Sequence, residues 1–242
     1  MRPQTEVSEG AKSAPSARIN FRMDELRNVN FYHRYFDKIR LMFMDESLFG
    51  RITTVRSCWC PKGVRPVVSS LNTNSNLIHG VPTEPQTQGV WDKRRRAVHD
   101  FKWDWYKVRE YVYAYGAIDP INGDNCFVIA GNCNTDWTNL FLCELSNRFP
   151  NDYILLCQDR ASWHTSQTLQ LPHNIEPFFI PPATPEMNPM EQIWEELKEK
   201  YFANRFFKTL DKATDQLCFG INDLDAKTII SITRREWILS TA

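Results

Sequence analysis

The sequence lacks long hydrophobic runs. Its apolar runs are short, as at 41–44 and 153–157, whereas a helix needs about 20 apolar residues to span a bilayer. This pattern excludes an integral membrane protein. Residues 1–18 are polar and contain no apolar stretch that a secretion machinery could read as a signal peptide. We therefore expect a cytoplasmic protein with no membrane partner.

Cysteine pairs and an excess of charge are also missing. The seven cysteines are an odd number, and Cys58 and Cys60 have no second pair or histidines at zinc-finger spacing. We expect reduced, mostly buried thiols. The 29 Lys and Arg residues balance the 29 Asp and Glu residues, whereas nucleic-acid-binding proteins usually carry a basic excess. A role on DNA therefore has to be argued from a site.

The composition is that of an ordinary globular protein. Of the 242 residues, 42% are hydrophobic, 24% charged and 13% aromatic. These values exclude disorder, collagen and coiled coil as descriptions of the whole chain. The length allows one sizeable domain with appendages.

The hydrophobic pattern predicts alternating strands and helices. Buried strands are predicted at 39–44 and 153–157, because these runs are too short for helices and almost continuously apolar. Two apolar segments around a turn rich in Pro, Asn and Gly predict a hairpin over 111–130. Further strands are predicted at 51–60 and 175–180, and helices at 134–149, 163–171 and 189–206. This order indicates an α/β fold.

The predicted elements divide the chain into three parts. Residues 1–38 hold few large apolar residues and are interpreted as a leader or linker, in which a short helix could start at 21–26. Residues 39–207 form the main domain. Within it, about 67–105 is expected to be an inserted segment, because its first half is too long and polar for an ordinary connection. Residues 208–242 are predicted to be a C-terminal helical tail.

Three carboxylates stand out by position. Asp45 and Asp159 each follow a buried strand, and Glu191 lies in the first turn of the helix that begins at Pro189. Each has an ordinary explanation, since aspartate forms turns and Glu191 would sit at the third position of a helix capped by Asn188. Two buried strands that both end in aspartate nevertheless indicate convergence at the edge where sites of α/β sheets form.

Convergent carboxylates predict a metal site. If the two strands are parallel neighbours, Asp45 and Asp159 come so close that both cannot ionise cheaply. Divalent cations relieve this repulsion, and hard oxygen ligands suit Mg²⁺ or Mn²⁺. Two such ions about 3.5–4 Å apart are known to stabilise both the attacking and the leaving oxygen when a phosphodiester bond is displaced. The expected chemistry is phosphoryl transfer.

Five blocks of residues form a recognisable series at 44–50, 63–66, 115–117, 158–166 and 188–198. These blocks resemble the catalytic blocks of DDE transposases of bacterial insertion sequences, in the branch related to the mariner transposases. The matching blocks lie between about Ile39 and Tyr201, in the order found in the family, and Glu191 follows Asp159 by 32 positions (191 − 159), close to the spacing in the family.

The resemblance implies a ribonuclease-H-like (retroviral-integrase-like) fold, a mixed sheet flanked by helices. It also implies a metal-dependent DNA endonuclease with Asp45, Asp159 and Glu191 as catalytic and metal-binding residues. Two Mg²⁺ or Mn²⁺ ions would act in strand cleavage at transposon ends and in transfer of the freed 3′ hydroxyl into TA-containing target DNA. An active protein of this kind is expected to be a homodimer.

The sequence departs from the family in four places. Arg160 replaces the usual asparagine, Ala183 stands where an aromatic residue is common, and the connection at about 67–105 is longer than usual. Only 38 residues precede Ile39, whereas the family places helix-turn-helix modules before the catalytic domain. We therefore expect the catalytic half alone, with the DNA-binding portion elsewhere.

Two further groups are candidates for DNA contact. Lys93, Arg94, Arg95 and Arg96 lie near several aromatic residues, and such a patch either contacts the DNA backbone or forms a solvated loop. His164 follows Asp159 by five positions. In the family this position is near the active site, so the imidazole either contacts a phosphate, positions a neighbouring group, or is a packing residue.

The favoured interpretation is the catalytic domain of a DDE transposase. One alternative keeps the fold and makes the chain a structure-specific nuclease. The other is an inactive or truncated remnant that only binds DNA or dimerises with an intact transposase.

Overall fold

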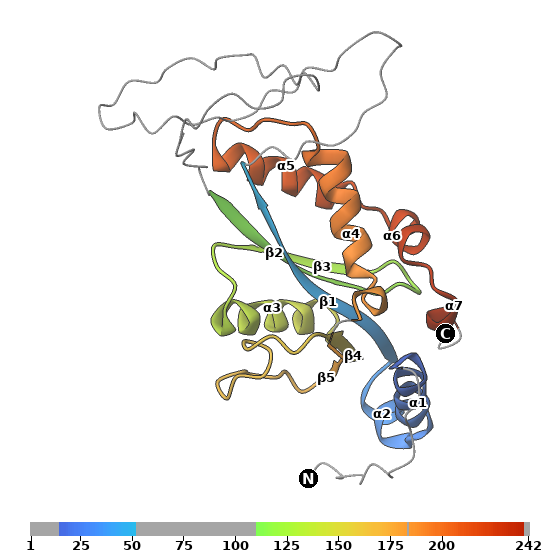
Figure 1. Cartoon of the computed structure of the whole chain (residues 1–242). Helices are drawn as coiled ribbons and strands as arrows, with labels where there is room; N and C mark the ends of the chain where they lie inside the picture. The colour runs from blue at the N-terminus through green and yellow to red at the C-terminus, as the bar shows by residue number, and fades with distance from the viewer. Residues whose placement is uncertain (1–14, 52–109, 183, 240–242) are drawn as a thin grey trace.

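A five-stranded mixed sheet forms the centre of the molecule (Figure 1). The computed structural model of the chain describes residues 15–51, 110–182 and 184–239. The strand order is β3-β2-β1-β4-β5, in which β2 runs antiparallel to both β1 and β3, whereas β1, β4 and β5 are parallel to one another. The strands are β1 (Lys38–Gly50), β2 (Tyr111–Ile118), β3 (Asn125–Ala130), β4 (Asp152–Gln158) and β5 (Ile175–Phe179).

β1 is longer than predicted. The sequence predicts a strand that ends before Asp45, but β1 continues to Gly50 because residues 43–50 pair with β2. Pairing between β1 and β4 stops at Phe43. Asp45 therefore lies inside a strand, just beyond the point where β1 loses its parallel neighbour.

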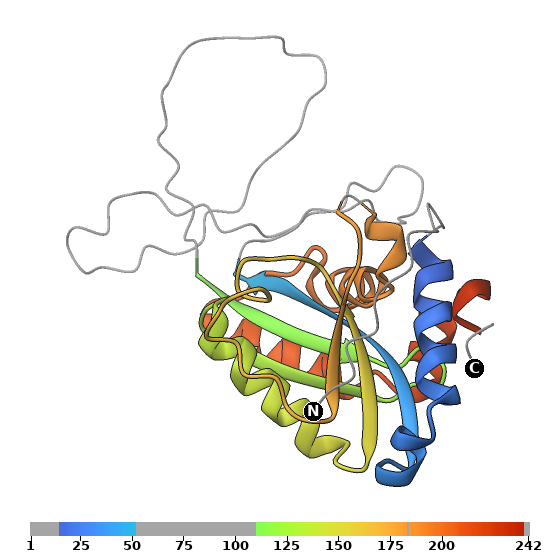
Figure 2. The ribbon, with the colours of Figure 1, turned by 90° about the horizontal axis from the view of Figure 1, so that it is seen from below.

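Helices cover both faces of this sheet (Figures 1 and 2). Successive side chains of a strand point to opposite faces, so β1 supplies Leu41 and Phe43 to one apolar cluster and Met42 and Met44 to the other. α3 (Thr135–Arg148) packs on the Met42 face. The Phe43 face is covered by α1 (Pro15–Asn28), α4 (Met190–Leu197), α5 (Leu210–Asn222), α6 (Ala226–Thr233) and α7 (Glu236–Leu239). None of the described helices is long and apolar enough to cross a bilayer.

Residues 15–35 belong to the folded domain, which corrects the predicted leader for this part of the chain. They form α1 and α2 (Asn30–Tyr35). Ile19, Met23 and Leu26 recur at helical spacing and are fully buried against the sheet. Arg22 makes an ion pair of 2.7 Å with Glu176 of β5. The helix starts earlier than the sequence suggested, and its packing makes it part of the core.

The C-terminal residues also differ from the predicted tail. α5, α6 and α7 bury Leu217, Ile229 and Ile238 in the same cluster as α1 and α4. Before them, α4 is followed by a π-helical turn over Lys198–Phe202, so this helical segment ends earlier than the predicted 206. The helices after α4 are thus components of the domain.

The hairpin prediction is confirmed, and one helix prediction is wrong. β2 and β3 pair around a turn in which Gly123 adopts a positive φ of 75°. The helix predicted at 163–171 is absent, and this segment consists of turns. The Ser166 hydroxyl accepts a hydrogen bond from the Thr168 backbone at 3.3 Å, and such local bonds compete with helix formation.

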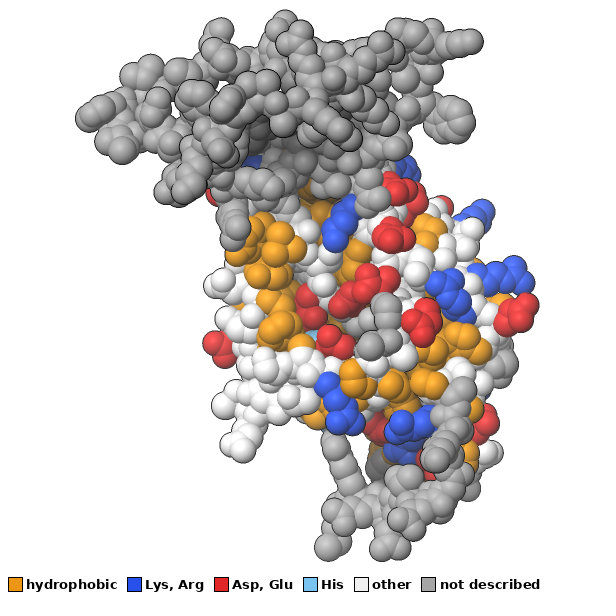
Figure 3. Space-filling view, in the orientation of Figure 1, with side chains coloured by type: hydrophobic (Ala, Val, Ile, Leu, Met, Phe, Trp, Pro, Cys, Tyr) orange, Lys and Arg blue, Asp and Glu red, His pale blue; other side chains and the backbone are white. Residues whose placement is uncertain are grey.

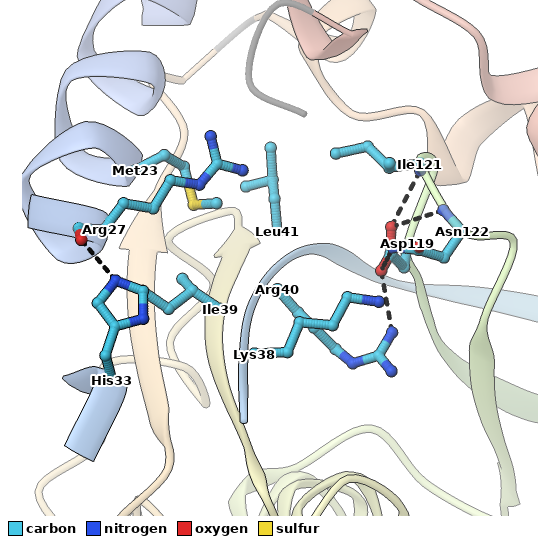
Figure 4. A pocket seen from close by; sticks show the side chains of 10 residues that line it. All are labelled: Met23, Arg27, His33, Lys38, Ile39, Arg40, Leu41, Asp119, Ile121 and Asn122. Atoms are coloured by element: carbon cyan, nitrogen blue, oxygen red, sulfur yellow. Dashed lines mark hydrogen bonds and ion pairs between the residues drawn. The ribbon is translucent and has the colours of Figure 1, made fainter. Parts of the chain in front are cut away.

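A cleft of about 540 Å³ lies at the start of β1, between α1 and the β2–β3 turn (Figure 4). Arg27 and Lys38 line it, together with Arg40, which makes an ion pair of 3.1 Å with the buried Asp119. Seven strand residues at about 3.3 Å each separate Lys38 from Asp45. Lys38 is therefore about 23 Å from Asp45 along the strand, and neither Asp45, Asp159 nor Glu191 lines the cleft.

Some predictions fall outside the described residues. These are the strand at 51–60 beyond its first residue, and the insertion at about 67–105.

Candidate active site

Asp45 and Asp159 lie at the same edge of the sheet. The parallel pairing of β1 with β4 ends at Phe43 and Cys157, and each aspartate follows its paired residue by two positions. Asp159 itself lies just beyond β4, which ends at Gln158. Neighbouring strands are about 4.8 Å apart, so the sheet brings both aspartates to the edge where β4 ends.

α4 lies along β1 and brings Glu191 to the same edge. Three side chains of this helical segment donate hydrogen bonds to β1: Asn188 to the Met44 carbonyl (3.0 Å), Trp194 to Asp45 Oδ2 (2.9 Å) and Lys198 to Ser47 Oγ (2.7 Å). These contacts follow the same order along both elements and fix the helix on the strand. Glu191 lies in the first turn, between the first two of them.

The start of α4 does not give Glu191 the helix-capping role that the sequence suggested. The helix begins at Met190, one residue later than predicted, and its N-cap is Pro189, which makes no side-chain capping bond. Asn188 instead accepts a hydrogen bond from the Met190 backbone at 3.1 Å. Glu191 is therefore at the second helical position, and the capping box expected from the sequence does not form.

Asp45 carries an uncompensated charge. Burial raises its pKa first, the nearby charges of Glu46 and Glu191 raise it further, and the pKa reaches about 7. The hydrogen bond from Trp194 only partly offsets these effects. A bound cation stabilises the ionised form of such a group.

Asp159 has the opposite electrostatic environment. Its side chain is 66% exposed, and its Oδ1 lies 2.9 Å from Nδ1 of His164. This hydrogen bond lowers the pKa of Asp159. Burial alone would lower the pKa of His164, but its hydrogen bonds to Asp159 and Glu46 outweigh burial and raise the pKa to about 9. The imidazole is thus protonated at neutral pH.

The residues present suit a divalent cation chemically. Asp45, Asp159 and Glu191 offer hard carboxylate oxygens, which Mg²⁺ and Mn²⁺ prefer, and the raised pKa of Asp45 shows that negative charge is in excess. Among the described residues, no three His, Cys, Asp or Glu side chains converge closely enough to hold one ion as they stand. Glu191 is exposed, so its side chain can reorient, whereas the exposed carboxylate of Asp159 is held at Oδ1 by His164 and by the Ala161 backbone.

Glu46 is a site residue that the sequence interpretation missed. Its side chain is 8% exposed and accepts hydrogen bonds from Trp163 Nε1 (3.1 Å) and, at 2.9 Å, from Nε2 of His164. The sequence could have indicated Glu46 through its position next to Asp45, because neighbouring residues of a strand face opposite sides of the sheet. A doublet such as Asp45 and Glu46 therefore supplies one carboxylate to each face.

The predicted DNA contacts have different outcomes. Lys93, Arg94, Arg95 and Arg96 lie outside the described residues, as does Ala183. His164 is 1% exposed and both of its ring nitrogens face carboxylates, so burial and prior bonding prevent it from presenting a ring nitrogen to DNA. The guanidinium of Arg160 lies 5.4 Å from the centre of the Phe179 ring, over β5.

Acidic side chains gather near the middle of the face shown in Figure 3, whereas basic side chains are spread around them. The concentration of acidic groups agrees with the charge repulsion at Asp45.

Solved structures of Mos1 share this fold. The Mos1 strand transfer complex has a TM-score of 0.53 at 12% identity, and the match covers 100% of this chain and 67% of the Mos1 chain. The pre-cleavage Mos1 transpososome has a TM-score of 0.54 at 11% identity, and the match covers 100% of this chain and 66% of the Mos1 chain. The Mos1 mariner paired end complex with Mn has a TM-score of 0.53 at 10% identity, and the match covers 96% of this chain and 62% of the Mos1 chain. The ribonuclease-H-like fold prediction is confirmed, and the chain spans about two thirds of the length of these Mos1 chains.

Sequence comparison identifies the family. An uncharacterized protein of Sinorhizobium fredii, y4pE/y4sA, is 32% identical over 130 residues, which are 52% of this chain and 96% of that protein. Residues 85–214 match the family described as DDE superfamily endonuclease. This match includes Asp159 and Glu191 and begins after Asp45. Because it covers more than half of the 242 residues, the chain belongs to the DDE superfamily of endonucleases.

Proposed function

We propose that this chain is the catalytic domain of a DDE transposase, which cleaves DNA strands at transposon ends and transfers them to target DNA. The observation that carries the proposal is the strand register, which brings Asp45 and Asp159 to the edge of the sheet where β4 ends, with the charge of Glu191 close enough to raise the pKa of Asp45. Membership of the DDE endonuclease family and the fold shared with Mos1 support it.

Asp45, Asp159 and Glu191 would hold two divalent ions, Mg²⁺ or Mn²⁺. Trp194 fixes Asp45 by binding Oδ2, and the exposed Asp159 and Glu191 side chains would complete the ligand set. Bound divalent ions supply Lewis-acid activation of the attacking water or 3′ hydroxyl and stabilise the leaving oxygen.

The proposed partner is DNA. The Mos1 structures are described as a strand transfer complex and a paired end complex, and we extend this to transposon ends and a TA-containing target for the present chain. Since the chain spans about two thirds of the Mos1 chains, a separate helix-turn-helix portion and a homodimeric active form belong to the proposal.

Nicking of supercoiled plasmid tests the site. The assay is run at low salt, which strengthens sequence-independent binding to the phosphate backbone, with Mn²⁺, Mg²⁺ or EDTA. We expect nicking with either metal, none with EDTA, and loss of nicking in Asp159→Asn and Glu191→Gln. Glu195→Gln is the matched control, because Glu195 is an exposed carboxylate one turn further along α4, and this variant is expected to nick like the wild type.

A second assay separates a transposase from a nuclease. A pre-cleaved DNA end with a free 3′ hydroxyl is incubated with TA-containing target DNA, and joined products are measured. Joining supports the transposase, whereas metal-dependent nicking without joining favours the structure-specific nuclease. Absence of nicking by the folded protein, or nicking retained in Asp159→Asn, would contradict the proposed catalytic site.

A further inference from the structure

The segment after β4 folds back beneath Asp159. Turns over 162–164 carry His164 to a position where it is 1% exposed. Its Nδ1 lies 2.9 Å from Asp159 Oδ1, and its Nε2 lies 2.9 Å from Glu46 Oε1. Trp163 Nε1 also donates to Glu46 Oε1 at 3.1 Å. One buried imidazole thus joins the loop aspartate to a carboxylate on the central strand.

The two acidic residues of β1 have different partners. Asp45 accepts a hydrogen bond from Trp194 of α4, on the face that α4 covers. Glu46 points to the opposite face, as strand alternation requires, and its bonds go to Trp163 and His164. Glu46 is therefore engaged in holding the segment after β4 and is not a fourth member of the metal-binding group.

The bonds to Asp159 are distributed unevenly over its carboxylate. Oδ1 accepts from the Ala161 backbone at 3.0 Å and from His164. Among the described residues, none donates a hydrogen bond to Oδ2. An exposed carboxylate outside a strand would otherwise sample several rotamers, and ordering it on ligand binding costs conformational entropy. Anchoring Oδ1 removes part of this cost and leaves Oδ2 for a ligand.

We propose that His164 and Glu46 are positioning residues for Asp159. Glu46 orients the imidazole, and the imidazole holds one carboxylate oxygen of Asp159 so that the other is available to a divalent cation. Buried groups behind metal ligands act in this way in other proteins, and their loss lowers metal affinity or activity by about 10- to 100-fold. The inference rests on the proposed function, because it requires Asp159 to be a metal ligand.

Two substitutions of His164 separate positioning from simple packing. The amide nitrogen of asparagine is one bond from Cγ, where Nδ1 is in histidine, and that of glutamine is two bonds away, where Nε2 is. His164→Asn therefore keeps a donor for Asp159 and loses the bond to Glu46. His164→Gln keeps a donor for Glu46 and loses the bond to Asp159. Both variants replace a buried ring by a smaller amide.

The primary readout is Mn²⁺ binding to the full chain without DNA, measured by calorimetry. We expect His164→Gln to lower the affinity for Mn²⁺ by about 10- to 100-fold and His164→Asn to retain it within about fivefold. Glu46→Ala, which removes the carboxylate that orients His164, is expected to lower the affinity for Mn²⁺ about tenfold. Glu46→Gln keeps an acceptor oxygen and is expected to restore most of this affinity. Urea unfolding of each variant identifies the folded ones, and the Glu46 pair decides the question if His164→Gln does not fold.

Asp159→Asn distinguishes failure of this inference from failure of the proposed function. If Asp159→Asn removes Mn²⁺ binding but His164→Gln and Glu46→Ala bind like the wild type, only the positioning role is overturned. If both His164 variants lose affinity in proportion to their loss of stability, the role is packing and the inference is also overturned. If the wild type binds no Mn²⁺, or Asp159→Asn binds it equally well, the metal site and the inference fail together.

Discussion

Replacing Asp45 by asparagine should stabilise the metal-free protein while removing its metal response. The buried carboxylate is repelled by Glu46 and Glu191, and its pKa rises from an ordinary 3.8 to about 7. An amide of the same shape has no charge to bury, and its oxygen can still accept the hydrogen bond from Trp194. Removing this charge therefore relieves repulsion without leaving a cavity.

The pKa gives the magnitude and the pH dependence. At about 1.36 kcal/mol for each pH unit, the charge disfavours the folded state by about 4 kcal/mol at pH 8, and relaxation of neighbouring groups reduces the expected gain of Asp45→Asn to about 2–4 kcal/mol. Between pH 3.8 and 7 the folded wild type binds more protons than the unfolded chain, so its stability falls as the pH rises through this range. The advantage of Asp45→Asn should shrink to less than about 2 kcal/mol at pH 5.

Urea unfolding in EDTA at pH 5 and pH 8, followed by tryptophan fluorescence, measures these differences. Asp37→Asn is the control, because Asp37 is an exposed aspartate before β1, and it should change stability by less than about 0.5 kcal/mol. Mn²⁺ should stabilise the wild type and not Asp45→Asn, since only a ligand that binds the folded state raises its stability. Destabilisation by Asp45→Asn in EDTA at pH 8 would refute the argument that charge is in excess at this position.

Three further substitutions test contacts that hold the fold together, measured by urea unfolding. Gly116→Ala should destabilise the protein by about 1–3 kcal/mol, because the added Cβ would lie 2.6 Å from Met190 Cε in α4 and 2.8 Å from a Trp194 ring atom. Gly131→Ala is the control and should be nearly neutral, because its added Cβ would have no atom within 4 Å. Equal effects of the two substitutions would contradict the tight contact of α4 with β2. Arg40→Met should cost about 3–5 kcal/mol, because it leaves the buried Asp119 without its cation, and a loss below about 1 kcal/mol would show that the ion pair is unimportant. Leu217→Ala should cost about 2–5 kcal/mol if α5 belongs to the core, while the 61% exposed Phe219 should tolerate alanine; similar losses at both positions would argue against that packing.

Local patterns were enough to predict most of the sheet. The short apolar runs at 39–44 and 153–157 predicted two buried strands, and turn residues around Gly123 predicted the hairpin, because both features depend on neighbouring residues. The parallel pairing of the two strands came from the structure. The end of β1 was not predictable in this way. Its continuation past Asp45 depends on pairing with β2, which starts more than 60 residues later in the sequence.

Errors arose where distant contacts override local preference. In the segment 163–171, the local bond to the Ser166 hydroxyl competes with helix formation, and Trp163 and His164 bond to Glu46, which is more than 110 residues away in the sequence. The predicted leader was wrong for residues 15–35 because polar residues surround the three apolar positions of α1, and only packing against β5 and α7 shows that they are buried.

The sequence by itself determined the family, the two strands and the three carboxylates, because motif spacing and apolar periodicity are properties of the chain order. The tertiary structure decided where each carboxylate lies and what it contacts. It brought Asp45 and Asp159 to the same edge of the sheet, directed Glu46 to the other face of β1, and enclosed His164 between two acids. Burial and the distances between charges set the pKa values of these groups, and both quantities exist only after the chain has folded.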